Sequence, residues 1–171
     1  MSKEKVKIVL DADVIIHFSK GEMLSLLPSF LPEYEFVVLD IVKKEVMKPT
    51  LTQLENQMNY LKNIKEVTFG ETAEEKKEFF RLAKTLGRGE SACMVYCRYN
   101  YNVVGSSNLR DIADYCNQWK ITYLTTLDFL YFGIKKEVIT LQDAYNFIER
   151  VTAAGSILPS VDFSMYRCDK L

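Results

Sequence analysis

The sequence is poor in the histidine and cysteine ligands of structural zinc sites, and it has no long apolar run. It has a single histidine, and its four cysteines include only one closely spaced pair, Cys93 and Cys97. Because a structural zinc site draws on about four such ligands, this composition argues against zinc and favours small buried residues. No apolar run approaches the roughly 20 residues of a membrane helix, so we expect no membrane partner.

Two further absences concern location and charge. Nothing near Met1 resembles a signal peptide, because charged residues are followed by only a short apolar run that Asp11 and Asp13 interrupt. We therefore expect a cytoplasmic protein with reduced thiols. The 22 basic and 23 acidic residues give a formal net charge of −1, which excludes a broad basic clamp on long nucleic acid but not a local basic path.

What remains is typical of one globular domain. The chain has 171 residues, of which 48% are apolar and 26% are charged. It contains no internal repeat, linker or low-complexity segment. We expect residues 1–150 to form a single domain and residues 151–171, which include Gly155 and Pro159, to form an irregular tail packed on it.

Short β-branched runs alternate with amphipathic segments along the chain. The runs predict strands at 6–10, 36–39, 67–69, 103–105 and 121–124. The other segments predict helices at 14–18, 23–31, 41–48, 51–63, 72–86, 90–99, 109–119, 126–132 and 140–151. The alternation predicts an α/β fold, with three α/β/α layers around a central, mostly parallel sheet of four to five strands.

Polar side chains cluster in the sequence just after the predicted strands and at one helix start. They are Asp11 and Asp13, Glu45, Glu90, and Ser106, Ser107, Asn108 and Asp111. Sites in parallel sheets form at the carboxyl ends of strands, so these groups are candidates to converge at one edge. Crowded carboxylates need a cation to stay ionised, and their oxygens suit Mg²⁺ or Mn²⁺, which can activate water for attack on a phosphoryl group.

Four segments also carry a family resemblance. Residues 8–16 form an apolar strand ending in Asp11, residues 87–92 place glutamate after glycine at a helix start, residues 103–112 run from a strand into a Ser-x-Asn turn, and residues 121–130 supply a closing strand and helix. In this order and spacing they resemble the PIN-domain ribonucleases over residues 6–132. The order of all four, rather than any single motif, carries the resemblance.

The resemblance implies a metal-dependent endoribonuclease in the cytoplasm, often the toxin of a toxin–antitoxin pair. RNA would be the substrate, an antitoxin protein a possible partner, and a homodimer a common assembly. The apolar helix at 51–61 fits either a contact in such a dimer or a place in the core. The implied catalytic residues are Asp11, Glu45, Glu90 and Asn108. The implied ligands of Mg²⁺ or Mn²⁺ are Asp11, Glu90 and Asn108. The implied supporting residues are Asp13, Ser106, Ser107 and Asp111.

Asn108 departs from the family pattern, in which many members carry aspartate at that position. A neutral amide removes one negative charge from the metal cage and can lower metal affinity. The sequence therefore leaves open a second function, a catalytically weakened PIN-like module that binds RNA or a partner protein. A third class, a small phosphotransferase or phosphatase, would use Asp11 as nucleophile but lacks an obvious lysine-centred loop after a later strand.

Several of these residues also have a purely structural interpretation. Asp11 or Asp13 fits an N-cap of the following helix, and Asn108 fits a turn or N-cap. Glu45 lies beside two lysines, as on a solvated helix face. We expect His17, the only histidine, to lie on a helix surface or at the edge of the core rather than to act as a general base.

Overall fold

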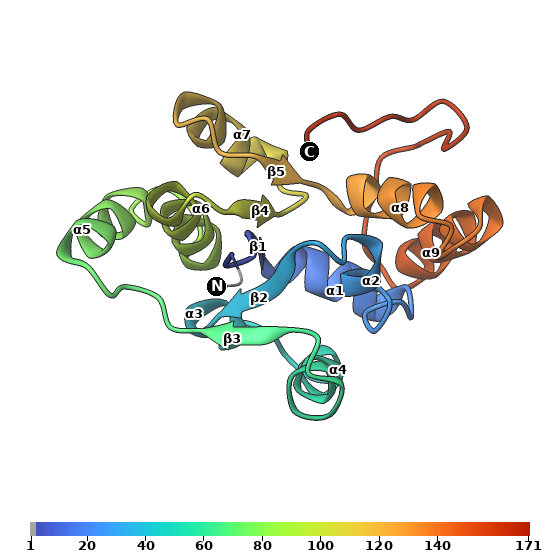
Figure 1. Ribbon diagram of the computed structural model, residues 1–171, viewed down its shortest axis with the longest axis horizontal. Coiled ribbons are helices and arrows are strands. Elements are labelled where there is room, and N and C mark those ends of the chain that lie inside the picture. Colours follow the sequence, from blue (N-terminus) through green and yellow to red (C-terminus); the bar gives the residue numbers. More distant parts are fainter. Residues whose placement is uncertain (1–2) are drawn as a thin grey trace.

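The computed structural model describes residues 3–171. In this part of the chain, one parallel sheet has the strand order β3-β2-β1-β4-β5. The strands are β1 (Lys7–Leu10), β2 (Glu35–Leu39), β3 (Lys65–Val67), β4 (Val103–Gly105) and β5 (Tyr123–Leu124). Helices cover both faces (Figure 1), which confirms the predicted three-layer α/β/α fold, and the sheet is parallel throughout.

The helices divide into two groups, one on each side of the sheet (Figure 1). The first group is α3 (Asp40–Lys43), α5 (Ala73–Leu82), α6 (Arg88–Asn100) and α7 (Leu109–Gln118). The second group is α1 (Ala12–Lys20), α2 (Leu27–Phe30), α4 (Thr50–Asn56), α8 (Thr126–Lys135) and α9 (Leu141–Ala153). A π-helical segment, η1 (Gln57–Leu61), continues α4.

Several predicted elements are displaced or shortened; among them, the helix expected at 72–86 ends at Leu82 and the strand expected at 121–124 begins at Tyr123. The helix expected at 41–48 is wrong beyond Lys43, because the N–H groups of Glu45 and Val46 turn back to carbonyls three residues earlier. The helix expected at 23–31 is confined to α2, since proline is tolerated only in the first turn and Pro28 stands there. The third strand lies two residues earlier than expected, where Lys65 pairs with Val37.

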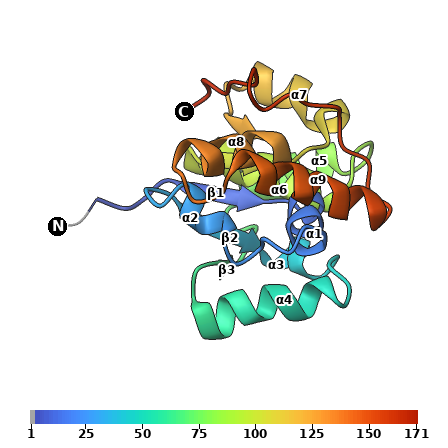
Figure 2. The same cartoon turned by 90° about the vertical axis from the view of Figure 1, so that its right-hand side faces the viewer.

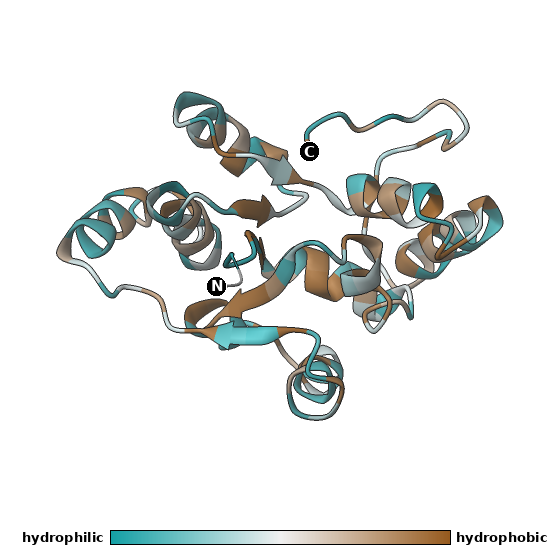
Figure 3. Ribbon diagram, in the orientation of Figure 1, coloured by the Kyte–Doolittle hydropathy of each residue, from teal (hydrophilic) through white to brown (hydrophobic). Residues whose placement is uncertain are grey.

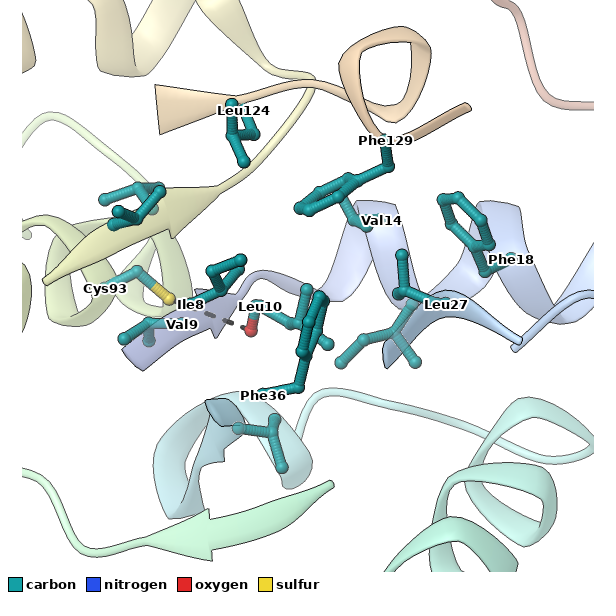
Figure 4. Close-up of a cluster of buried hydrophobic side chains, with 14 of the residues drawn as sticks. Ile8, Val9, Leu10, Val14, Phe18, Leu27, Phe36, Cys93, Leu124 and Phe129 are labelled. Carbon is teal, nitrogen blue, oxygen red and sulfur yellow. Dashed lines mark hydrogen bonds between the residues drawn. The ribbon is translucent and has the colours of Figure 1, made fainter. Parts of the chain in front are cut away.

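Apolar side chains fill the space on both faces of the sheet. Phe129 packs against Phe18 and Phe36, with ring centroids 6.2 Å and 6.1 Å apart, and all three rings are buried (Figure 4). The Cys93 thiol of α6 lies 4.0 Å from the Leu10 carbonyl of β1. All four cysteines lie in the described residues and are buried and free.

The edge strand β3 differs in character from the inner strands. Figure 3 shows β3 as hydrophilic and β1, β2 and β4 as hydrophobic, and Lys65 and Glu66 are exposed. This is the ordinary pattern for a short edge strand, which charged side chains protect from pairing with another chain. Within residues 3–171, no helix has both the length and the apolar character needed to cross a bilayer.

The C-terminal segment, residues 154–171, leaves α9 and ends near β5 (Figures 1 and 2). All of it is described, and it forms neither helix nor strand. Two of its residues bind the buried carboxylate of Asp128, because Tyr166 Oη donates to Oδ1 at 2.6 Å and Lys170 Nζ donates to Oδ2 at 2.8 Å. Burial alone would raise the pKa of Asp128, but these bonds and the Thr125 N–H lower it.

We expect Tyr166→Phe to lower the free energy of unfolding by about 1–2 kcal/mol, because Asp128 loses a donor in a buried site. Urea unfolding at pH 7 measures this change. Tyr101→Phe is the matched control, since Tyr101 is 90% exposed, and it should alter stability by less than about 0.5 kcal/mol. Equal stability of the two variants would contradict a role for Tyr166 in holding the segment.

Candidate functional site

The predicted site residues lie where the direction of the chain through the sheet reverses. From β1 the chain continues to β2 on one side and later to β4 on the other. The carboxyl ends of parallel strands at such a switch point form a crevice that commonly binds ligands. Leu10 pairs with Gly105, and the Asp11 N–H donates to the Gly105 carbonyl at 2.8 Å. Asp11 and Ser106 therefore leave the sheet side by side.

Asp11 is an N-cap, as its structural interpretation predicts, and its carboxyl group also lies at the edge where the other site residues meet. It is the N-cap of α1, where its extended backbone lets Oδ1 accept the Ala12 N–H at 2.8 Å. Its Oδ2 accepts a bond from Ser106 Oγ at 3.4 Å. The residue is only 4% exposed, so its carboxyl group is held at this edge of the sheet with little contact with water.

Glu45 reaches the same edge of the sheet from the turn after α3 and not, as expected, from within a helix, and it remains exposed to solvent. Its Oε1 accepts the backbone N–H of Gly89 in the first turn of α6 at 3.2 Å. A Cβ atom on residue 89 would overlap Glu45 Oε2 and lie 3.3 Å from Asp11 Oδ1. Glycine at this position therefore allows two carboxylates to approach the positive N-terminal end of a helix.

Asn108 bridges two further carboxylates. Its Nδ2 donates to Glu90 Oε1 at 2.6 Å and to Asp111 Oδ2 at 2.9 Å. Asn108 is the N-cap residue of α7, yet its side chain makes no capping bond, so the turn interpretation accounts for its position but not for its contacts. The second oxygen of Glu90, Oε2, is buried without a hydrogen-bond partner.

The loop after β4 contains Ser106 and Ser107, and its hydrogen bonds bind the Asp13 carboxylate of α1. The Ser107 N–H donates to Asp13 Oδ2 at 2.8 Å, and the Asn108 N–H donates to Ser106 Oγ at 3.2 Å. Asp13 Oδ1 accepts the Val14 N–H at 2.7 Å. The loop thus fixes one carboxylate through its backbone and contacts a second, that of Asp11, through the Ser106 hydroxyl.

The carboxylates at this edge disfavour one another's ionisation. Burial, followed by the charge of Asp13 and then those of Glu90 and Glu45, raises the pKa of Asp11 to about 8. Burial also raises the pKa of Asp13 and of Glu90, and the neighbouring Asp111 charge adds to the rise at Glu90. Because the pKa values of all three carboxyl groups are raised, the site lacks positive charges that would stabilise the ionised forms.

The donor set fits a hard divalent cation. It consists of carboxylate oxygens and one amide, the groups that suit Mg²⁺ and Mn²⁺, and Glu90 contributes a buried oxygen without a partner. Within residues 3–171, however, no three acidic, thiol or imidazole side chains lie close enough together to form a ready-made metal cage. Metal binding would therefore require these side chains to draw together.

All eight residues singled out from the sequence lie at this one edge. They are connected by the contacts of Asp11 with Ser106, of Glu45 with Gly89, of Asp13 with Ser107, and of Asn108 with Glu90 and Asp111. The charges of Asp13, Glu45 and Glu90 all act on Asp11. Their chemical roles stay predictions.

Two residues at this edge were not foreseen in such a position, Thr126 and His17. His17 Nδ1 lies 2.8 Å from Thr126 Oγ1, and Ser107 Oγ donates to the same Thr126 oxygen at 2.8 Å. Burial, with a smaller effect of Lys20, lowers the pKa of His17 to about 4, so the ring is neutral at pH 7. Thr126 could have been found from its position just after the fifth strand, whereas nothing in the sequence indicates the partner of His17.

Comparison with known proteins adds no relative. No protein-family model matches this chain, and no curated protein matches it in sequence. The fold and the site thus define its class on their own: a parallel α/β protein with an acidic cluster at the switch point of its sheet.

We expect Asp11→Asn to raise the free energy of unfolding by about 1–3 kcal/mol at pH 7 in buffer with a chelator. Because burial and neighbouring charges raise the pKa of Asp11 to about 8, folding at pH 7 must protonate a carboxylate that is ionised in the unfolded chain, at a cost in free energy. The amide keeps the acceptor that caps α1 and avoids this cost. Urea unfolding measures the change, and Asp114→Asn, at an exposed position of α7, is the control. An Asp11→Asn protein less stable than the wild type would show that the carboxylate is compensated.

Proposed function

We propose that this protein is a metal-dependent endoribonuclease of the PIN-domain type, which hydrolyses phosphodiester bonds in RNA. The observation that carries the proposal is the convergence of Asp11, Glu45, Glu90 and Asn108 at the switch point of a parallel sheet. These residues come from four separate segments of the chain, so their meeting at one edge is specific to the folded protein.

Asp11, Glu90 and Asn108 would hold Mg²⁺ or Mn²⁺, with Glu45 next to them at the start of α6. When bound, the cation would neutralise the carboxylates, polarise a phosphoryl oxygen and activate the attacking water. Gly89 keeps the first turn of α6 open to two carboxylates. Asp13, Ser106, Ser107 and Asp111 support the ligands through the hydrogen bonds described above.

The protein's own charges control how RNA approaches. The acidic cluster repels phosphates until it is neutralised, so RNA binding should be weak and sensitive to salt. Basic side chains lie beside the cluster in sequence. Lys44 is exposed next to Glu45, and Arg88, two residues before Glu90, lies 5.2 Å from the centre of the Phe79 ring. We assign contacts with RNA phosphates to these two residues.

The proposal extends to location and partners. It implies a cytoplasmic enzyme, a toxin whose partner is an antitoxin protein, and a homodimer. The segment expected to take part in dimer formation is divided between two environments, because Leu54 is fully buried whereas Tyr60 and Leu61 are 80% and 58% exposed. Within that segment, Tyr60 and Leu61 are the side chains with which a second copy would make contact.

We expect Asp11→Asn to abolish Mn²⁺-dependent cleavage of single-stranded RNA, with a rate loss of at least about 100-fold. A fluorophore–quencher RNA measures the rate, and circular dichroism checks that the fold is retained. Asp114→Asn should cleave at the wild-type rate. An Asp11→Asn protein that cleaves as fast as the wild type would refute the proposed mechanism.

One observation favours a second candidate function, a non-catalytic module that binds RNA or a partner protein. Asn108 donates to two carboxylates at once, and these hydrogen bonds stabilise the two anions without a cation. In an enzyme with aspartate at this position, no such donor would be present. The amide therefore stabilises the acidic cluster in the absence of metal, as a binding module requires.

Asn108→Asp distinguishes the two functions. We expect the added carboxylate to strengthen Mn²⁺ binding by about tenfold and to lower metal-free stability by about 1–2 kcal/mol, because two donated hydrogen bonds are lost. Calorimetry and urea unfolding measure the two effects, and Asn117→Asp, exposed on α7, is the control. Cleavage that rises with affinity supports the enzyme, whereas a wild type and a variant that both fail to bind Mn²⁺ or cleave RNA support the module.

A further inference from the structure

A continuous chain of hydrogen bonds runs from the first turn of α1, across the loop after β4, to α8 and back to α1. Asp13 Oδ2 accepts the Ser107 N–H at 2.8 Å, and Ser107 Oγ donates to Thr126 Oγ1 at 2.8 Å. Thr126 Oγ1 in turn lies 2.8 Å from His17 Nδ1. These hydrogen bonds begin at Asp13 and end at His17, one turn apart on α1, so they connect the loop after β4 and the start of α8 to α1.

The donors and acceptors in this chain are mutually consistent. Ser107 Oγ accepts the Thr126 N–H at 2.9 Å, so its own proton is free to point at Thr126 Oγ1. The Thr126 hydroxyl can then donate its proton to His17 Nδ1, which is an acceptor in the neutral ring. Every hydroxyl proton in the chain has one acceptor, so the three side chains hold each other in a single arrangement.

Thr126, which links Ser107 to His17 in this chain of hydrogen bonds, is held firmly at the start of α8. Thr126 is fully buried at the first position of α8. The preceding Thr125 forms a capping box with Asp128, the carboxylate that also binds Tyr166 and Lys170. The start of α8 is therefore held from both the helix and the C-terminal segment, which makes Thr126 a rigid support for Ser107.

We propose that His17 and Thr126 are positioning residues, which act through Ser107 to fix the Asp13 carboxylate within the acidic cluster. The inference rests on the proposed function, because it gives these residues a role in metal binding. Asp13 lies among like charges and is disfavoured as an anion by its burial. Without a fixed Ser107 N–H, its carboxylate would turn away from the other carboxylates, and the oxygen set would lose its geometry. Asp13 supports the ligands rather than binding the cation, and its charge acts on the proposed ligand Asp11. Groups that support metal ligands typically contribute 10–100-fold to metal affinity.

Thr126→Val tests the inference, because it keeps the side-chain shape and removes the hydroxyl. Thr50→Val is the matched control: Thr50 Oγ1 donates to Ser19 Oγ at 3.2 Å and is also buried, but it belongs to α4. Both variants lose a buried Thr–Ser hydrogen bond, and Thr126→Val also loses the bond to His17, so Thr126→Val should lose more stability than the control by the worth of one hydrogen bond, about 1 kcal/mol. His17→Leu removes the terminal acceptor, and His17→Asn restores an acceptor oxygen near the position of Nδ1.

Two measurements test whether these hydrogen bonds position Asp13. Amide hydrogen exchange of Ser107, followed by NMR in metal-free buffer, should accelerate at least about tenfold in Thr126→Val and not in Thr50→Val. The Mn²⁺ dissociation constant, measured by calorimetry, should rise about tenfold in Thr126→Val and His17→Leu. It should stay within about twofold of the wild type in Thr50→Val and His17→Asn.

The outcomes separate the inference from the proposed function. Wild-type Mn²⁺ binding with unchanged affinity in Thr126→Val would overturn the positioning role and leave the metal site standing. Faster Ser107 exchange with unchanged affinity would also overturn it, because the chain would then be merely structural. A wild type that binds no Mn²⁺ would overturn both. Weakened binding in Thr126→Val and His17→Leu, with recovery in His17→Asn, would support it.

Discussion

Repulsion between carboxylates at one edge of the sheet is the constraint around which the rest of this structure is arranged. Burial and three neighbouring charges raise the pKa of Asp11 to about 8, and none of the ion pairs in residues 3–171 involves Asp11, Asp13 or Glu90. The molecule holds these groups together with neutral donors instead: backbone N–H groups, hydroxyls and the Asn108 amide. Such an arrangement stores unfavourable energy that a cation would relieve.

Strand pairing, close packing and hydrogen bonds keep the carboxylates in place against this repulsion. The pairing of β1 with β4 sets Asp11 beside Ser106, and the close approach at Gly89 brings α6 against Asp11 and Glu45. On the other side, α8 is capped by its own first turn and held by the C-terminal segment through Asp128. The C-terminal segment is thus connected to the site through Asp128 and the start of α8, although it contributes no carboxylate to the site.

The residue at position 108 affects how far the acidic cluster depends on a metal ion. Its amide satisfies one oxygen each of Glu90 and Asp111, while Glu90 Oε2 has no partner. An aspartate there would replace a neutral amide with a charged carboxylate, which would favour a cation but also add repulsion in the metal-free state. This balance explains why the same geometry supports both an enzyme and a binding module as candidates.

Local sequence patterns were sufficient for the order of strands and helices, because periodicity and short-range sterics decide them. The strands at 36–39 and 103–105 and the helix that begins after Asp11 lie where their side chains require. The eight site residues could be chosen from their positions after strands and at a helix start, since parallel strands end at one edge. What only the tertiary structure decided are contacts between segments far apart in sequence. These are the bond from the Gly89 N–H to Glu45, the space that Gly89 leaves for two carboxylates, and the link from His17 through Thr126 to Ser107. These depend on how helices pack across the sheet, and residues 109 positions apart in the chain, such as His17 and Thr126, carry no local pattern that joins them.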